Sequence, residues 1–259
     1  MPRLLRGHLG LVYFFLYAPI LMLMVLSFNR AGLPTVWTGV SFDWYSKLFT
    51  SPDIIKAAGN SLLVALASTT IATFLGTLLA LGIERRPASA AADALLFAPM
   101  IIPDVVLAIA LLSFFTLLNF TLGLHSIILA HVVFNIAFVC AVVRARLKNF
   151  DWSLPEASAD LGAGSITTFV RVTFPLIAPA VLAAALLAFT LSVDEFIIAY
   201  FTAGAGQSST TLPMKIYAMI RFGVTPEINA MATIVMLLSF ALVLLSQRLD
   251  RGAIGGRKS

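Results

Sequence analysis

Three acidic residues lie inside segments of this sequence that are otherwise apolar enough to cross a membrane. Asp104 follows Pro103 in one such segment, and Asp194 and Glu195 are adjacent in another. A charged side chain in the hydrocarbon region costs from about 2.5 to well over 10 kcal/mol, so acids placed there are candidate functional residues. The apolar segments contain no Lys or Arg. These acids are therefore expected to face water, a partner subunit, a proton or a cationic substrate; solvation at the outer membrane interface is the alternative.

The composition of the chain is typical of a membrane protein. Of its 259 residues, 60% are hydrophobic and 11% are charged, with a mean hydropathy of +0.98. Soluble domains carry about 25% charged residues. We predict an all-α membrane protein with six transmembrane helices in a single transmembrane domain over 1–259, each span being an apolar run of near-bilayer length. The predicted spans are about 9–28, 61–83, 94–118, 126–143, 176–201 and 228–246.

Two prolines in the third predicted span and the cysteine of the chain have consequences for the local structure. Pro99 and Pro103 are expected to break the third span, because proline removes a backbone donor and clashes with the preceding turn. Cys140 is the one cysteine of the chain, so no disulfide can form within it.

Positive charge is unevenly divided between the two sides of the predicted spans. Six spans put both termini on one side, and that side carries 12 of the 17 Lys and Arg residues against 5 on the other. Positive residues concentrate in cytoplasmic loops. We therefore expect that the protein lies in the inner (cytoplasmic) membrane of the cell and that both of its termini are in the cytoplasm. The net charge of +5 is explained in this way and does not indicate a nucleic-acid partner.

The segment between the fourth and fifth predicted spans is expected to form two short helices joined by a glycine turn. Ser153 and Glu156 have the spacing of a capping box, in which each side chain bonds the other residue's backbone amide. Gly162 and Gly164 are expected to supply the left-handed backbone that ends the first helix. The second helix should end near Pro175. An ordinary capped hairpin joining two spans would show the same pattern.

This segment, 153–175, resembles the cytoplasmic coupling loop of ABC importer permeases. Glu156-Ala157, Gly162 and Pro175 stand at the family's offsets, and the chain departs from the pattern with small or apolar residues at Ser158, Val172 and Phe174. In that family the loop docks a helix into a groove on the ATPase subunit. The resemblance therefore implies a set of ATPase-coupling residues, namely Glu156, Ala157, Asp160, Gly162, Gly164 and Pro175.

A wider resemblance, running over nearly the whole chain, is to the spermidine/putrescine-type branch of these permeases. The segments of this chain that carry the resemblance are 15–22, 44–45, 103–106, 187–196, 211–217 and 226–233. The branch carries the third-span Pro-Asp and the fifth-span acid pair, which implies a substrate path at Asp104, Asp194 and Glu195. Carboxylates in a low-dielectric path favour a di- or trication such as putrescine or spermidine. Related branches carry other small organic solutes.

The resemblance also implies the partners of the chain. They are an ATP-binding subunit dimer, a second and paralogous permease that completes the path, an extracytoplasmic solute-binding protein and the lipid bilayer. The sequence contains no G-x-x-x-x-G-K-[ST] motif to cradle ATP phosphates, so ATP hydrolysis is assigned to the separate subunit. We expect no cofactor, no metal site and no enzymatic activity in the chain itself.

Two other classes of function are compatible with part of the pattern. A stand-alone carrier or channel could use the acids with His131 and Asn135, which share a face of the fourth span, as a proton relay. An interhelical hydrogen bond is the simpler interpretation of that pair. A membrane-embedded enzyme would need a nucleophile or metal set facing the carboxylates, and the sequence offers neither.

Overall fold

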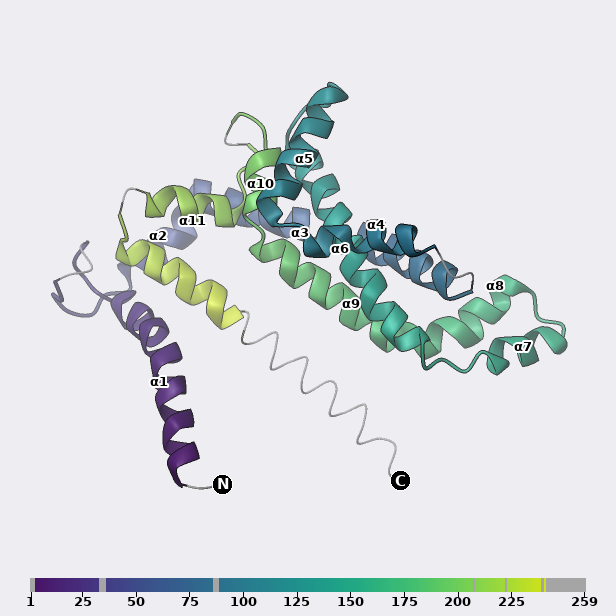
Figure 1. The fold of residues 1–259 in the computed structure, drawn as a ribbon. Coiled ribbons are helices and arrows are strands. Elements are labelled where there is room, and N and C mark those ends of the chain that lie inside the picture. The colour runs from purple at the N-terminus through teal and green to yellow at the C-terminus, as the bar shows by residue number, and fades with distance from the viewer. Residues whose placement is uncertain are drawn as a thin grey trace. The chain divides into compact units, whose positions relative to one another are not determined.

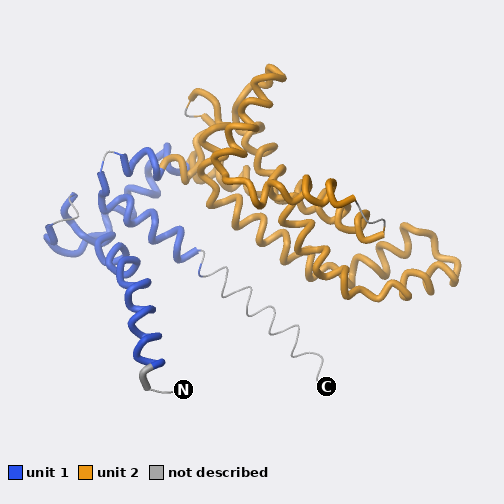
Figure 2. Tube along the Cα trace, in the orientation of Figure 1, with its two compact units in different colours: residues 1–55, 216–259 blue, residues 56–215 orange. Residues whose placement is uncertain are grey.

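The computed structural model describes residues 3–32, 36–85, 89–206, 208–221, 223–238 and 240. Within these ranges the chain is helical, with one isolated bridge between Asn29 and Val40 and no longer strand. It separates into two compact units, 1–55 with 216–259 and 56–215 (Figure 2). Each unit is described by itself below. The helical expectation from the sequence is confirmed.

The helices follow one another with short connections (Figure 1). They are α1 (Arg3–Leu26), α2 (Asp43–Thr50), α3 (Pro52–Arg85), α4 (Ala90–Ile101), α5 (Asp104–Leu117), α6 (Leu124–Leu147), α7 (Ser153–Asp160), α8 (Ser165–Thr168), the π-helical turn η1 (Phe169–Thr173), α9 (Phe174–Asp194), α10 (Ile197–Thr202) and α11 (Leu212–Ile220).

Four of the described helices are long and apolar enough to cross a membrane, or five if α4 and α5 are counted as one bent span. A further apolar helix, Pro226–Leu238, is shorter. It covers the first part of the sixth predicted span, 228–246, and most of the remainder lies outside the described residues. The count of six spans stays a prediction.

The third predicted span is broken at Pro103 and not at Pro99. Helices α4 and α5 meet at an angle of 110°, and Pro99 lies inside α4. The residue before Pro103, Ile102, has an extended backbone (φ −68°, ψ 134°), as expected because the proline ring disfavours the helical region for its predecessor. The predicted break is therefore confirmed at Pro103 and wrong at Pro99.

The fifth predicted span differs from expectation at both ends. The helix does not end near Pro175, because α8, η1 and α9 continue from Ser165 to Asp194 as one helical stretch of 30 residues. Pro175 follows the π-turn η1, where it falls in the first turn of α9 and its missing amide proton costs little. At the other end, Glu195 is extended (φ −71°, ψ 122°). It separates α9 from α10, so the span predicted over 176–201 is two helices.

Helix α6 forms the centre of the unit 56–215. It lies beside α9, as Figure 1 shows, and also contacts α4, α5 and α10. Its buried side chains, among them Val139 and Val143, belong to a core cluster that also includes Ala80 of α3 and Ala184 of α9. Gly76 lets α3 approach α6 closely, as small residues do in membrane helix pairs. This arrangement fixes α6 as the element against which the site is built.

The unit 1–55 with 216–259 is organised around a polar residue, Asn29, which is fully buried. Its side-chain amide donates to the carbonyl of Val36 (2.8 Å), its side-chain oxygen accepts from the amide of Thr38 (3.1 Å), and Trp44 donates to its carbonyl (2.8 Å). Trp44 is thus anchored by a hydrogen bond.

We predict that Gly76→Ala destabilises the protein by about 1–3 kcal/mol, the usual cost of overpacking. A Cβ at this position would lie 2.8 Å from Val139 Cβ and 3.0 Å from the carbonyl oxygen of Ile136, and the backbone oxygen has no rotamer with which to move away. The midpoint of thermal unfolding in detergent measures the loss.

The matched control is Gly82→Ala in the same helix, where an added Cβ meets nothing within 4 Å. Equal stability of the two variants would contradict the close approach of α3 and α6.

Candidate functional site

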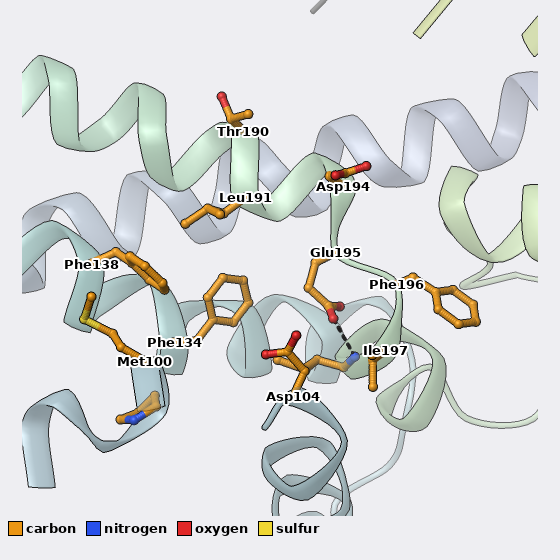
Figure 3. Close-up of a pocket in the computed structure, with 12 residues that line it drawn as sticks. Met100, Asp104, Phe134, Phe138, Thr190, Leu191, Asp194, Glu195, Phe196 and Ile197 are labelled. Carbon is orange, nitrogen blue, oxygen red and sulfur yellow. Dashed lines mark hydrogen bonds between the residues drawn. The ribbon is translucent and has the colours of Figure 1, made fainter. Parts of the chain in front are cut away.

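The three predicted acids line a single pocket of about 510 Å³ in the unit 56–215. The pocket lies where the two helix breaks, between α4 and α5 and between α9 and α10, approach α6. Its lining residues are Pro99, Met100, Asp104, Phe134, Phe138, Thr190, Leu191, Asp194, Glu195, Phe196, Ile197 and Ile198 (Figure 3). The lining contains no Lys, Arg or His.

Glu195 is held by the backbone of the helix that follows it. Its Oε1 accepts from the amide of Ile198 (2.8 Å) and its Oε2 from the amide of Ala199 (2.9 Å). Oε2 also lies 3.5 Å from Nε2 of His131 on α6, and the Glu195 side chain is 11% exposed. From the sequence, only Lys and Arg were considered as partners of the acids, and the histidine and the two backbone amides that contact Glu195 were not included.

Asp104 and Asp194 differ from Glu195 in being exposed and without a polar partner among the described residues. Asp104 is the first residue of α5, where the positive end of the helix dipole favours a carboxylate. Asp194 is the last residue of α9, where the dipole is unfavourable and a cation is favoured. Figure 3 shows Asp104 and Glu195 pointing into the same space, whereas the Asp194 carboxylate points away from it at the end of α9.

Aromatic side chains form much of the remaining wall. Phe134 and Phe138 of α6 pack edge to face, with ring centroids 6.5 Å apart, and Phe196 lies at the break between α9 and α10. Carboxylates combined with aromatic faces suit an organic cation, because both attract positive charge and the rings also accept apolar methylene groups. The lining of the pocket is therefore chemically suited to a small organic cation.

The hairpin between α6 and α9 begins with hydrogen bonds between Asp151 and Ser153 that the sequence interpretation missed. Asp151 Oδ1 accepts from the hydroxyl of Ser153 (2.6 Å) and from its amide (3.0 Å). These hydrogen bonds lower the pKa of the Asp151 carboxyl. The predicted capping box of Ser153 with Glu156 is wrong, because the hydroxyl is used by Asp151 and α7 has no side-chain cap bond. The sequence signal that indicates this contact is the spacing of Asp151 and Ser153, in which the acid lies two residues before the serine.

One of the two predicted turn glycines has the left-handed backbone. Gly162 has a φ of +83°, whereas Gly164 has an ordinary φ of −69°, so the expectation for Gly164 is wrong. The two helices of the hairpin are joined by a hydrogen bond between the hydroxyls of Ser158 and Thr168 (3.0 Å). The predicted coupling residues Glu156, Ala157 and Asp160 all lie on α7 and are exposed, as is Pro175.

A groove of about 460 Å³ lies between the hairpin and the end of α3. It is lined by Glu84, Arg85, Trp152, Pro155, Glu156, Ala159, Ala163, Ser165 and Thr168. The guanidinium of Arg85 lies over the ring of Trp152, 5.6 Å from its centroid. Beyond the groove, Leu161 and Ile166 are 89% and 81% exposed. Large apolar side chains gathered at the tip of a hairpin are typical of a surface that binds another protein.

Arg144 near the end of α6 ties the ends of two other helices together. Its Nε lies 3.2 Å from Glu84 Oε1 of α3, and its Nη1 lies 3.1 Å from Asp93 Oδ1 of α4. The guanidinium also lies 5.7 Å from the ring centroid of Phe97. Arg144 and Glu84 are both less than one fifth exposed. Since α4 has no buried residue of its own, this ion pair holds its first turn.

The pocket and the hairpin both fall inside a region that matches a known family. Residues 72–254 match the family described as binding-protein-dependent transport system inner membrane component. The chain belongs to this family. The resemblance to ABC importer permeases is thereby confirmed, and the chain is a multi-pass inner membrane protein that serves transport and not enzymatic catalysis.

Relatives resemble the chain over most of its length. The spermidine/putrescine transport system permease protein PotC of Haemophilus influenzae is 40% identical over 248 residues, which are 95% of this chain and 96% of that protein. PotC of Escherichia coli K12 is 40% identical over 257 residues, 98% and 97% of the two chains. The putrescine transport system permease protein PotI of the same strain is 42% identical over 231 residues, 86% and 82% of the two chains.

A solved structure has the same fold over nearly the full length. A chain of a bacterial ABC transporter involved in the import of the acidic polysaccharide alginate superposes with a TM-score of 0.74 at 19% identity, covering 96% of this chain and 95% of that one. At this level of identity the likeness concerns the fold alone.

We predict that Arg144→Gln lowers the stability of the protein by about 1–3 kcal/mol, because two half-buried carboxylates lose their partner. Arg146→Gln, two residues away on the same helix, is the control; Arg146 is exposed and donates one long hydrogen bond of 3.4 Å to the carbonyl of Leu176. The thermal unfolding midpoint of each variant checks the prediction. A similar small shift for both variants would count against it.

Proposed function

We propose that the chain is the transmembrane permease subunit of an ATP-driven importer and forms half of the path for a small cationic solute such as putrescine or spermidine. The observation that carries the proposal is the pocket in which Asp104, Asp194 and Glu195 come together without a Lys or Arg among the lining residues. The relatives named for spermidine and putrescine transport support the same substrate class.

The charge of the pocket fits a solute with two or three ammonium groups. In a medium of low dielectric constant, a carboxylate without a partner is strongly unfavourable, and a passing ammonium group compensates it. Asp104 and Asp194 are the two acids with no partner among the described residues. We assign Asp104, which points into the pocket, to contact with the cation, Asp194 to attraction of the cation at the end of α9, and Glu195 to the wall of the path, where its remaining charge adds to the attraction.

The arrangement of the chain in the membrane follows the distribution of positive residues. We propose that the whole chain, 1–259, is one permease domain of six spans with both termini in the cytoplasm. Arg85, Arg144 and Arg171 then lie on the cytoplasmic side with the hairpin. The pocket acids would lie deeper in the membrane.

The hairpin is proposed as the docking element for an ATP-binding subunit dimer. Its helix α7 presents Glu156, Ala157 and Asp160, and the exposed Leu161 and Ile166 supply apolar area for a protein partner. The path needs a second, paralogous permease on the open side of the pocket. An extracytoplasmic binding protein delivers the solute; a related alginate transporter has been solved in complex with its substrate-bound periplasmic protein.

The test of the substrate class is reconstitution of the chain with its ATPase, partner permease and binding protein in proteoliposomes. Putrescine or spermidine should stimulate ATP hydrolysis and accumulate inside. We predict that Asp104→Asn lowers maximal uptake about tenfold, since one charge-assisted contact is lost, whereas Asp104→Glu retains most of it. An assembled complex that responds to another solute and not to polyamines would overturn the cationic substrate and keep the importer.

A charge reversal tests the coupling role of the hairpin. We predict that Glu156→Lys abolishes ATP-driven uptake while the chain still folds and inserts, because the residue is exposed and its side chain has no partner among the described residues. Asp43→Lys is a matched control, since Asp43 and Glu156 both lie in the first turn of an eight-residue helix. Uptake by Glu156→Lys at the level of the control would show that the hairpin does not depend on this residue for coupling.

A further inference from the structure

A histidine that the transport path does not expose lies directly behind the pocket. His131 of α6 is 1% exposed and packs against Phe134, with ring centroids 5.4 Å apart. Its Nδ1 lies 2.7 Å from the hydroxyl oxygen of Ser192 on α9, and that oxygen lies 3.0 Å from the hydroxyl oxygen of Ser68 on α3. A continuous polar contact therefore runs through the buried interior from α3 through α9 to α6.

The second nitrogen of the same ring faces the pocket acid Glu195. His131 Nε2 is buried and has no hydrogen-bond partner among the described residues, but it lies 3.5 Å from Glu195 Oε2. This distance is longer than a formed N–H···O bond, so the contact is electrostatic. Among the described residues, Glu195 is the one acid that approaches the imidazole within ion-pair distance. Its two oxygens already accept from Ile198 and Ala199.

The direction of the hydrogen bonds follows from these contacts. If the proton of a neutral imidazole were on Nδ1, the lone pair of Nε2 would face the carboxylate of Glu195, which is repulsive. With the proton on Nε2, that N–H points at the carboxylate and Ser192 donates to Nδ1. Ser68 then donates to Ser192 at 3.0 Å, in preference to the carbonyl of Ala65 at 3.3 Å. Each hydroxyl then donates once and each facing pair is complementary.

We propose that His131 is a positioning residue for Glu195. As a neutral imidazole protonated on Nε2, it holds the carboxylate at the break between α9 and α10, with its remaining charge directed into the pocket. The inference rests on the proposed function for its consequence in transport, but the tautomer and the contact stand independently of the solute. Without the imidazole, the break would keep its two backbone bonds and lose the side-chain contact between Glu195 and α6.

The histidine content of the chain allows a direct spectroscopic test. The sequence has three histidines, and replacing His8 and His125 with Asn leaves His131 alone. Nitrogen NMR of this purified, ¹⁵N-histidine-labelled chain should show a neutral ring with the proton on Nε2, and Glu195→Gln should shift that signal. A proton on Nδ1, a charged ring, or a signal that Glu195→Gln leaves unchanged would overturn the proposal whatever the chain transports.

Two isosteric replacements separate positioning from simple packing. The side-chain amide of Gln places a donor near the site of Nε2, whereas that of Asn places one near Nδ1 and leaves Glu195 without its side-chain partner. His131→Asn should lower maximal uptake of putrescine about tenfold, and His131→Gln should restore most of it. The double variant His131→Asn with Glu195→Gln should be no slower than Glu195→Gln alone, because both changes remove one interaction.

The control and the contrary outcomes are defined by the same assay. His125→Asn, on the exposed start of the same helix, should transport normally. Multiplicative losses in the double variant, or an equal loss for Asn and Gln at position 131, would overturn positioning. If the unaltered complex takes up no putrescine, the proposed function fails, and the NMR result alone decides the role of His131.

Discussion

Inside a bilayer each backbone amide and carbonyl group needs a partner within the protein, and the pocket of this chain is shaped by that requirement. A helix break frees several such groups. At the break after Asp194 the freed amides of α10 are satisfied by the carboxylate of Glu195. At the other break Pro103 supplies no amide, and the amides of Val106 and Leu107 bond its carbonyl. Two breaks can therefore lie beside one cavity without leaving these groups unpaired.

Helix α6 links the pocket to the hairpin. It bears His131 and Phe134 at the pocket, meets α3 closely where Gly76 faces Val139, and ends near Arg144, which holds the first turn of α4. Helix α4 in turn contributes Pro99 and Met100 to the pocket lining. A displacement of the hairpin would therefore reach the pocket along two routes, directly through α6 and through the ion pair to α4. Packed helices transmit such shifts as rigid elements.

The corrections to the sequence interpretation share a physical cause. The Ser153 and Glu156 spacing matches a capping box, but Asp151 is nearer and takes the hydroxyl. Pro175 has the appearance of a helix stop, but a π-turn before it makes the missing donor harmless. In both cases the rule described the property of the residue correctly, but a neighbouring residue or turn changed the outcome. Glu195 differs: its amide partners are three and four residues further on, in α10, but His131 comes from α6, and no spacing along the chain indicates that contact.

The sequence by itself determined the helical class, most of the spans, the hairpin and the identity of the three acids. Each of these can be recognised from local composition, because an apolar run and a proline or acid inside it are visible in the sequence without knowledge of the neighbours in space. The tertiary structure decided that the acids line one pocket, that Glu195 is held and Asp104 and Asp194 are not, and that His131 faces Glu195. Those relations join residues far apart in the chain, and packing of α6 against its neighbours creates them.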